Sequence, residues 1–283
     1  MTSPRAGADA SYCLAYLTLD ACPPPEMIYL AARAGYESVG LRPIGMGLAG
    51  EPDFELHDNP KLLVQTQRAL DFTGITVHNI ELARVHASVE PEDYAPAFEI
   101  SAELGAKHVI SSIWSPGREA YLDKFGRLCE VAGRFGLTVN LEFVPIAEIK
   151  DLDGAVDVLR AVNAPNSGLM LDMYHCYRAG MTAQDLDGLP PQWFNFVHLC
   201  DAPERVPDSF EDLRTELREG RLYLGEGGID VADYLCHIPE VVYSIELPNL
   251  ARAKEFGGAE HAARCIDTSR DYFTKNPVTP TGR

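Results

Sequence analysis

The chain has 283 residues, of which 46% are hydrophobic and 23% charged, so it has ample apolar material for a large core. Its 42 acidic and 24 basic residues give a formal net charge of −18. A surface of that sign repels nucleic acid and anionic membranes, which argues against a nucleic-acid-binding protein.

Seven cysteines are scattered along the chain, and none forms a Cys-x-x-Cys pair. This pattern argues against a disulfide framework or a thiolate zinc cluster, and it favours a reducing, cytoplasmic setting. The first residues, MTSPRAGADASYC, lack a basic region followed by an apolar core, so we expect no secretory signal. No apolar run approaches the length of about 20 residues that a membrane span requires.

Eight β-rich runs alternate with amphipathic segments of helical length. Near-continuous apolar strands that alternate with helices predict parallel pairing with both faces covered. Eight such units without a linker favour a single (β/α)8 TIM barrel over residues 1–283, closed by a long helix near 253–275 and ending in a frayed tail at 276–283. An open doubly wound sheet is the alternative, but no glycine-rich phosphate-binding motif follows the first strand. The expected strands are 13–20, 36–42, 75–83, 107–114, 138–145, 167–175, 194–202 and 241–249.

The last four expected strands each bring an acidic or imidazole side chain to the same end of the barrel. Glu142 follows the fifth strand, Asp172 the sixth, His198 the seventh and Glu246 the eighth. Buried carboxylates that converge in this way repel one another unless a cation lies among them. The sequence therefore predicts one divalent metal ion held by Glu142, Asp172, His198 and Glu246. Oxygen and nitrogen ligands without sulfur favour Mn²⁺, with Mg²⁺, Co²⁺ or Zn²⁺ as alternatives.

Other side chains near the ends of these strands allow more than one interpretation. Asp172 could instead cap the next helix, although that cap is expected at Thr182. Asp201 and Glu226 are expected to brace the site, and GEGGID at 225–230 to form a tight turn before a short helix. Five residues near the ends of the third and fourth strands either line the pocket or are ordinary rim residues: His78, Glu81, Arg84, His86 and Trp114.

The motifs Glu, Asp-x-x-His, His-x-x-Asp, Gly-Glu-Gly and Glu follow one another between residues 142 and 246. In this order they resemble the sugar phosphate isomerase/epimerase superfamily, the xylose isomerase-like TIM barrels. The resemblance implies metal binding by the same four residues and a role for Glu142 and Glu246 as the catalytic acid/base pair. It also implies substrate contacts from His175 and Glu148, and often a homo-oligomer.

Two positions depart from the superfamily pattern. The epimerases carry an arginine a fixed distance after the metal-binding histidine, and Arg205 lies one residue further along. Many isomerases and dehydratases carry a lysine two residues after that histidine, where this chain has Cys200. Arg205 is therefore either a substrate-binding residue or an ordinary loop cation.

These residues predict an isomerase or epimerase of carbohydrate metabolism that acts on a small sugar or polyhydroxy ketone by proton transfer through an enediolate. A dehydratase of a keto-inositol or of a 3-dehydroshikimate-like ring is the alternative within the superfamily. A DNA-repair endonuclease would need extra histidine ligands and a basic groove, and a metal-free sugar-binding barrel is a further alternative.

Overall fold

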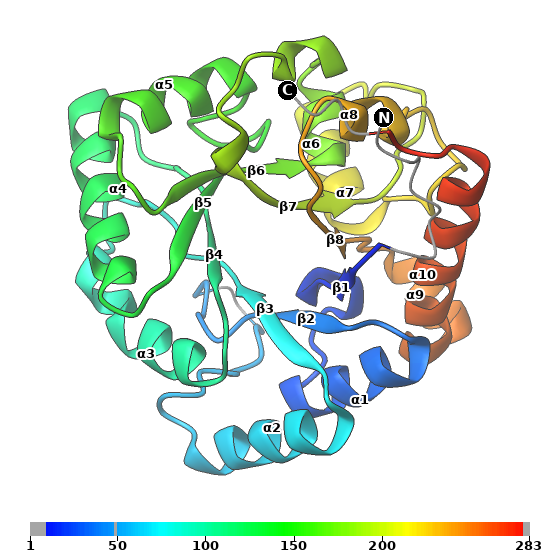
Figure 1. The fold of residues 1–283 in the computed structure, drawn as a ribbon, viewed down its shortest axis with the longest axis horizontal. Coiled ribbons are helices and arrows are strands. Elements are labelled where there is room, and N and C mark those ends of the chain that lie inside the picture. Colours follow the sequence, from blue (N-terminus) through cyan, green and yellow to red (C-terminus); the bar gives the residue numbers. More distant parts are fainter. Residues whose placement is uncertain (1–9, 48–49, 280–283) are drawn as a thin grey trace.

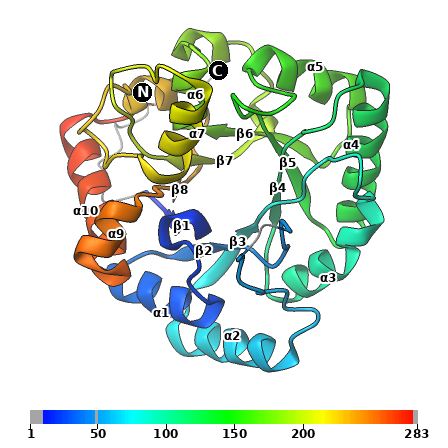
Figure 2. The ribbon, with the colours of Figure 1, turned by 180° about the vertical axis from the view of Figure 1, so that it is seen from behind.

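The structure is a computed structural model that describes residues 10–47 and 50–279. Its eight strands are parallel and close into a barrel in the order β1 to β8, as predicted. Figure 1 shows the strands as a central ring with the helices outside, and Figure 2 shows the same arrangement from behind. The strands are β1 (Tyr12–Leu14), β2 (Ser38–Leu41), β3 (Thr76–Ile80), β4 (His108–Ser111), β5 (Thr138–Glu142), β6 (Ser167–Asp172), β7 (Phe194–Leu199) and β8 (Val242–Ile245).

The helices that cover the barrel begin and end at residues suited to those positions. Asn59, Asp151 and Ser209 accept hydrogen bonds from backbone N–H groups at the starts of three helices, and Gly35 ends another in the left-handed conformation. The α-helices are α1 (Pro24–Ala34), α2 (Pro60–Thr73), α3 (Ala95–Glu103), α4 (Arg118–Gly133), α5 (Leu152–Val162), α6 (Met173–Arg178), α7 (Phe210–Glu219), α8 (Val231–Cys236), α9 (Leu250–Phe256) and α10 (Gly258–Lys275). Short 3₁₀ helices are η2 (Tyr16–Leu19), η3 (Pro91–Tyr94), η4 (Ala183–Leu186) and η5 (Pro191–Trp193).

Three details differ from the expectations. The first strand ends early, and its expected second half is the 3₁₀ helix η2. The long closing helix is broken into α9 and α10 at Gly257, whose φ of 80° lies outside the helical region. Within the expected frayed tail Val278 is only 2% exposed, so this residue is packed against the fold. Residues 1–9, where no signal is expected, and residues 280–283 lie outside the described residues.

The barrel interior is filled by side chains rather than open. Ile110 from β4, Met170 from β6 and Phe196 from β7 form a buried apolar cluster. The rings of His78 and His108 each lie within 5.5 Å of the Phe196 ring, measured between centroids. Two imidazoles therefore pack into this interior layer beside an apolar ring.

The register of the strands sets the positions of the predicted metal ligands. Asp172 pairs with His198 across β6 and β7, and Glu142 pairs with Met170 across β5 and β6. Parallel strands in register bring these side chains to the carboxyl end of the barrel, where barrel enzymes build their active sites.

Two further sequence expectations concern the cysteines and the membrane. All seven cysteines are free, which agrees with the expected absence of a disulfide framework. Among the described helices, none has the length and apolar character to cross a membrane.

The interior histidines predict a pH dependence of stability. Burial lowers the pKa of His78 from 6.5 to about 3 and that of His108 to about 4. Because the unfolded chain binds these protons more readily, each histidine should lower the free energy of unfolding as the pH falls below about 6.5, by up to about 1.4 kcal/mol per pH unit. We expect His78→Gln to reduce this slope between pH 6.5 and 5 in urea unfolding. An unchanged slope would contradict the assignment.

Candidate metal centre and active site

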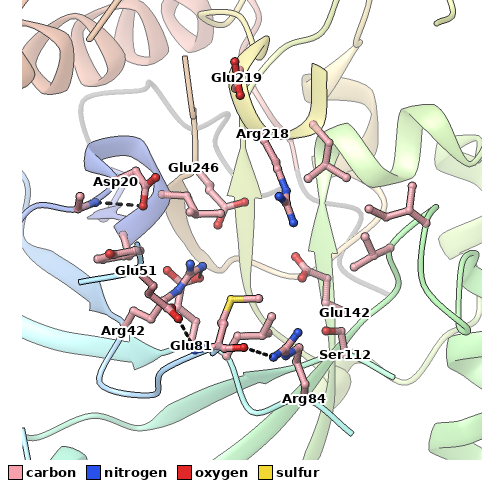
Figure 3. A pocket seen from close by; sticks show the side chains of 18 of the residues that line it. Asp20, Arg42, Glu51, Glu81, Arg84, Ser112, Glu142, Arg218, Glu219 and Glu246 are labelled. Carbon is pink, nitrogen blue, oxygen red and sulfur yellow. Dashed lines mark hydrogen bonds and ion pairs between the residues drawn. The ribbon is translucent and has the colours of Figure 1, made fainter. Parts of the chain in front are cut away.

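A cavity of about 460 Å³ lies at the carboxyl end of the barrel strands. Arg42, Glu81 and Ser112 reach it from the ends of β2, β3 and β4, while Glu142 and Glu246 reach it from β5 and the segment after β8. Figure 3 shows Glu142 and Glu246 on different sides of this space. The cavity is therefore bordered by side chains from most of the barrel's circumference.

Three carboxylates surround one ring nitrogen of His198. Its Nδ1 lies 3.4 Å from Glu246 Oε2, 3.6 Å from Asp172 Oδ2 and 3.9 Å from Glu142 Oε1. All four residues are buried. The structure thus brings the four predicted metal ligands together.

This cluster fits a divalent cation. Ligand atoms bound to one ion at about 2.1 Å lie about 3 to 4 Å apart, which is the spacing seen here. Glu142, Asp172 and His198 each offer a ligand atom within 4.8 Å of the other two. Neither ring nitrogen of His198 has a hydrogen-bond partner, so the imidazole is free to bind a cation. Glu246 joins this set through its contact with Nδ1, and its role as fourth ligand stays a prediction.

The two oxygens of Asp172 have separate partners. Oδ1 accepts a hydrogen bond from the backbone N–H of His175 and so caps α6, while Oδ2 faces His198. The prediction that Thr182 caps a helix is confirmed, but the prediction that Asp172 does not cap one is wrong. Thr182 caps the later helix η4, and Asp172 caps α6 as well. One carboxylate can do both because capping uses a single oxygen.

Arg221 is the residue that the sequence reasoning missed. Its side chain has no exposed surface, and its Nη1 lies 2.6 Å from Asp172 Oδ2 and 3.0 Å from Glu246 Oε2. Nη1 also donates to the sulfur of Cys200 at 3.6 Å, and Nε donates to the carbonyl of Leu217. A positively charged side chain therefore lies beside Cys200, the position at which many superfamily members carry a lysine. Here it comes from the segment after α7.

Arg221 changes the charge balance inferred from the sequence. The sequence predicts that a metal ion alone compensates the three carboxylates, whereas the structure also supplies one fixed positive charge beside them, that of Arg221. With neutral imidazoles the cluster keeps two negative charges, which one divalent cation would neutralise.

The pKa values of the cluster follow from burial and from these neighbours. Burial raises the pKa of Glu142 well above its ordinary value, and the charges of Asp172 and Glu246 add to this effect. Burial alone would raise the pKa of Asp172, but Arg221 and His175 hold it well below its ordinary range. Burial would lower the pKa of His198, yet Glu246 and Asp172 raise it well above 6.5. The cluster of Glu142, Asp172, His198 and Glu246 therefore strongly stabilises a positive charge placed within it.

His175 lies beside the cluster and lines the cavity. Its Nε2 is 3.9 Å from Glu142 Oε1, and its Nδ1 has no hydrogen-bond partner. Burial lowers the pKa of this imidazole to about 4, so the neutral form is present at physiological pH. It can donate or accept one hydrogen bond with a bound molecule.

Two predicted substrate-binding residues are not among those that border the cavity. Glu148 is exposed. Arg205 has a side chain that is 77% exposed and pairs with Asp208, because the segment after β7 turns it outward. Their substrate contacts stay predictions. The arginines that do line the cavity are Arg42, Arg84, Arg218 and Arg221, and Figure 3 shows Arg218 reaching into it from α7.

The five rim residues divide between the two interpretations. Glu81, Arg84 and Trp114 line the cavity. His78 packs in the barrel interior. His86 contacts Ser88 and is not among the lining residues.

Asp201 and Glu226 brace the loop that carries Arg221, as expected. Asp201 accepts hydrogen bonds from the backbone N–H groups of Gly225, Gly227 and Ile229. Glu226 accepts from the backbone of Tyr223 and pairs with Arg252. The segment 225–230 forms the expected turn before α8, and a side chain at Gly227 would collide with the carbonyl of Ala202.

Residues 28–268 match the family model of the xylose isomerase-like TIM barrels. The chain belongs to this family. The predicted resemblance is thereby confirmed, and the closed eight-stranded barrel agrees with it.

Similar curated proteins include two kinds of enzyme. An inosose isomerase of Bacillus subtilis is 25% identical over 162 residues, which cover 54% of this chain and 56% of that protein. A 3-dehydroshikimate dehydratase of Pseudomonas aeruginosa is 29% identical over 182 residues, which cover 62% of this chain and 28% of that protein. The chain thus matches little more than half of the isomerase and a smaller part of the dehydratase. Relatives of this chain are accordingly isomerases and a dehydratase.

Two solved structures share the fold along nearly the whole chain. The IOLI protein with a binding zinc atom has a TM-score of 0.77 at 20% identity and covers 94% of this chain and 99% of its own. A D-allulose 3-epimerase from Methylomonas sp., in complex with D-allulose, has a TM-score of 0.67 at 17% identity and covers 93% and 97%. At identities of 20% and 17%, the similarity to these two structures shows a shared fold.

The buried ion pair of Arg221 predicts a large effect on stability. Arg221→Met leaves Asp172 without its guanidinium, and we expect the metal-free protein to lose about 3–5 kcal/mol of unfolding free energy in urea. Arg205→Met is the matched control, because it breaks an exposed pair with Asp208 and should cost at most about 1 kcal/mol. Equal losses of unfolding free energy in the two variants would show that the buried ion pair stabilises the protein no more than the exposed pair does.

Proposed function

We propose that this protein is a divalent-metal-dependent isomerase or epimerase of a small polyhydroxy ketone. The observation that carries the proposal is the group of three buried carboxylates around His198 Nδ1, at the edge of a cavity large enough for a small sugar. The reaction is proton transfer through an enediolate.

Glu142, Asp172, His198 and Glu246 would hold the metal. When bound there, a divalent ion withdraws electron density from a ketone and an adjacent hydroxyl and so makes the C–H bond between them more acidic. Mn²⁺ fits the mixed oxygen and nitrogen ligands best, and Zn²⁺ is a second candidate, since a structural neighbour binds zinc.

The proton is transferred by the two glutamates. Glu142 and Glu246 reach the cavity from β5 and from the end of β8, on different sides of the space in Figure 3. One carboxylate can remove a proton from one face of a carbon, and the other can return a proton to the opposite face. His175 is placed to hold a substrate oxygen through its unpartnered Nδ1.

A dehydratase is the second candidate. It is favoured by the dehydratase relative, whose identity of 29% is slightly above that of the inosose isomerase. Removal of the same C–H proton followed by loss of a β-hydroxyl would give that reaction with the same side chains. Both relatives point to a cyclic ketone that carries hydroxyl groups, and the scattered, free cysteines favour a reaction in the cytoplasm.

Solvent deuterium exchange tests the proposal. The manganese-loaded protein is incubated in D₂O with ketoses, an inosose and 3-dehydroshikimate, and the products are followed by NMR and by ultraviolet absorbance. We expect carbon-bound deuterium in a new sugar or inosose. A new aromatic absorbance from 3-dehydroshikimate, or a new enone absorbance from the inosose, instead identifies the dehydratase.

Matched variants assign the chemistry to the two glutamates. Glu142→Gln and Glu246→Gln should each lower exchange by about 100-fold or more, because each removes one proton-transfer group. Glu219→Gln alters an exposed carboxylate on the same cavity and should leave exchange unchanged. No exchange with any of these compounds in the metal-loaded wild type would contradict the proposal.

A further inference from the structure

A second polar pair lies on the cavity wall away from the metal centre. Arg42 follows β2 and Glu81 follows β3, whereas the predicted metal ligands lie at the carboxyl ends of β5 to β8. In Figure 3 both lie on the side of β2 and β3, across the cavity from Glu142. The proposed proton transfer uses neither residue.

Glu81 is buried without full hydrogen bonding. Its exposed fraction is 3%, and its Oε1 has no hydrogen-bond partner. Its Oε2 lies 3.8 Å from Arg42 Nη2, which is too far for a hydrogen bond. A buried carboxylate oxygen without a partner is costly, so its retention on a cavity wall points to a ligand that supplies a donor.

Arg42 offers the complementary donor. Its guanidinium carbon lies 4.6 Å from the centroid of the Tyr16 ring, which fixes the plane of the group. Its Nε has no hydrogen-bond partner. Both residues therefore line the same cavity, and each keeps one buried polar atom, an acceptor on Glu81 and a donor on Arg42, without a partner.

A hydroxyl group satisfies both atoms, since its O–H donates to Glu81 and its oxygen accepts from Arg42. A carboxylate could pair with Arg42, but it has no hydrogen to donate to Glu81 and would be repelled by it.

We infer that Glu81 and Arg42 form a hydroxyl-binding subsite that selects neutral polyhydroxylated substrates over carboxylate-bearing ones. This inference rests on the proposed function, because it concerns the part of the substrate remote from the reacting carbons. Burial raises the pKa of Glu81 to about 7, so the selection against a carboxylate should be strongest above this pH, where Glu81 is ionised. The subsite favours an inosose-like ring over a 3-dehydroshikimate-like ring.

Calorimetry with two unreactive probes tests the subsite. The manganese-loaded wild type is titrated with myo-inositol, a neutral cyclic polyol, and with shikimate, which carries a carboxylate. We expect tighter binding of myo-inositol. In Glu81→Gln the ratio of the two dissociation constants should move toward shikimate by about tenfold, because a charged acceptor is replaced by a neutral one.

Glu103→Gln alters an exposed carboxylate outside the cavity lining, so it is the control and should leave both dissociation constants unchanged. Glu81→Gln is informative only if it keeps the manganese content and melting temperature of the wild type. If it does not, Arg42→Gln tests the inference in its place, and this variant should weaken myo-inositol binding by about tenfold. Tighter binding of shikimate by the wild type, no binding of myo-inositol, or an unchanged ratio in a folded, metal-loaded Glu81→Gln would overturn the inference. Where Arg42→Gln decides, unchanged myo-inositol binding would overturn it. Neither probe reacts, so this result is independent of whether deuterium exchange supports the proposed function.

Discussion

The structure of the site depends on the burial of three carboxylates around one imidazole. Burying like charges at these distances is unfavourable, and the chain offsets part of the cost with the fully buried Arg221, which contacts Asp172 and Glu246. With ionised carboxylates and neutral imidazoles the remaining charge is negative, and the carboxylate oxygens that carry it surround His198 Nδ1. An arrangement of this kind binds a cation because the fold holds the negative charges together before the cation arrives.

The barrel supplies this rigidity through its register and its loops. Asp172 and His198 are paired residues of adjacent parallel strands, so their side chains cannot separate without disturbing the sheet. Arg221 is held less directly. Its neighbour Leu222 forms an antiparallel bridge with Asp201, and Asp201 in turn binds the backbone of the glycine-rich turn that follows. The loop after β7, the turn before α8 and the charge balance of the site therefore form one connected unit.

The sequence was sufficient for those features that follow from local pattern. The eight apolar strands and the side chains at their ends predicted the barrel and brought Glu142, Asp172, His198 and Glu246 to one place. Arg221 could not be found in this way, because its partners lie 49 and 25 residues away along the chain and it sits outside any strand. Superfamily spacing suggested Arg205 as the substrate cation, yet spacing does not determine the direction of a loop, and Arg205 faces solvent beside Asp208. For Glu81 the sequence left two interpretations open, a pocket residue or an ordinary rim residue, because its burial depends on residues from other strands.

Diffraction from crystals grown with Mn²⁺, measured at the manganese absorption edge, tests the central claim most directly. The account predicts one strong anomalous peak within bonding distance of His198 Nδ1 and the carboxylates of Glu142, Asp172 and Glu246, with Arg221 still paired to Asp172. A peak elsewhere, or these side chains in place around water with no anomalous signal, would contradict it.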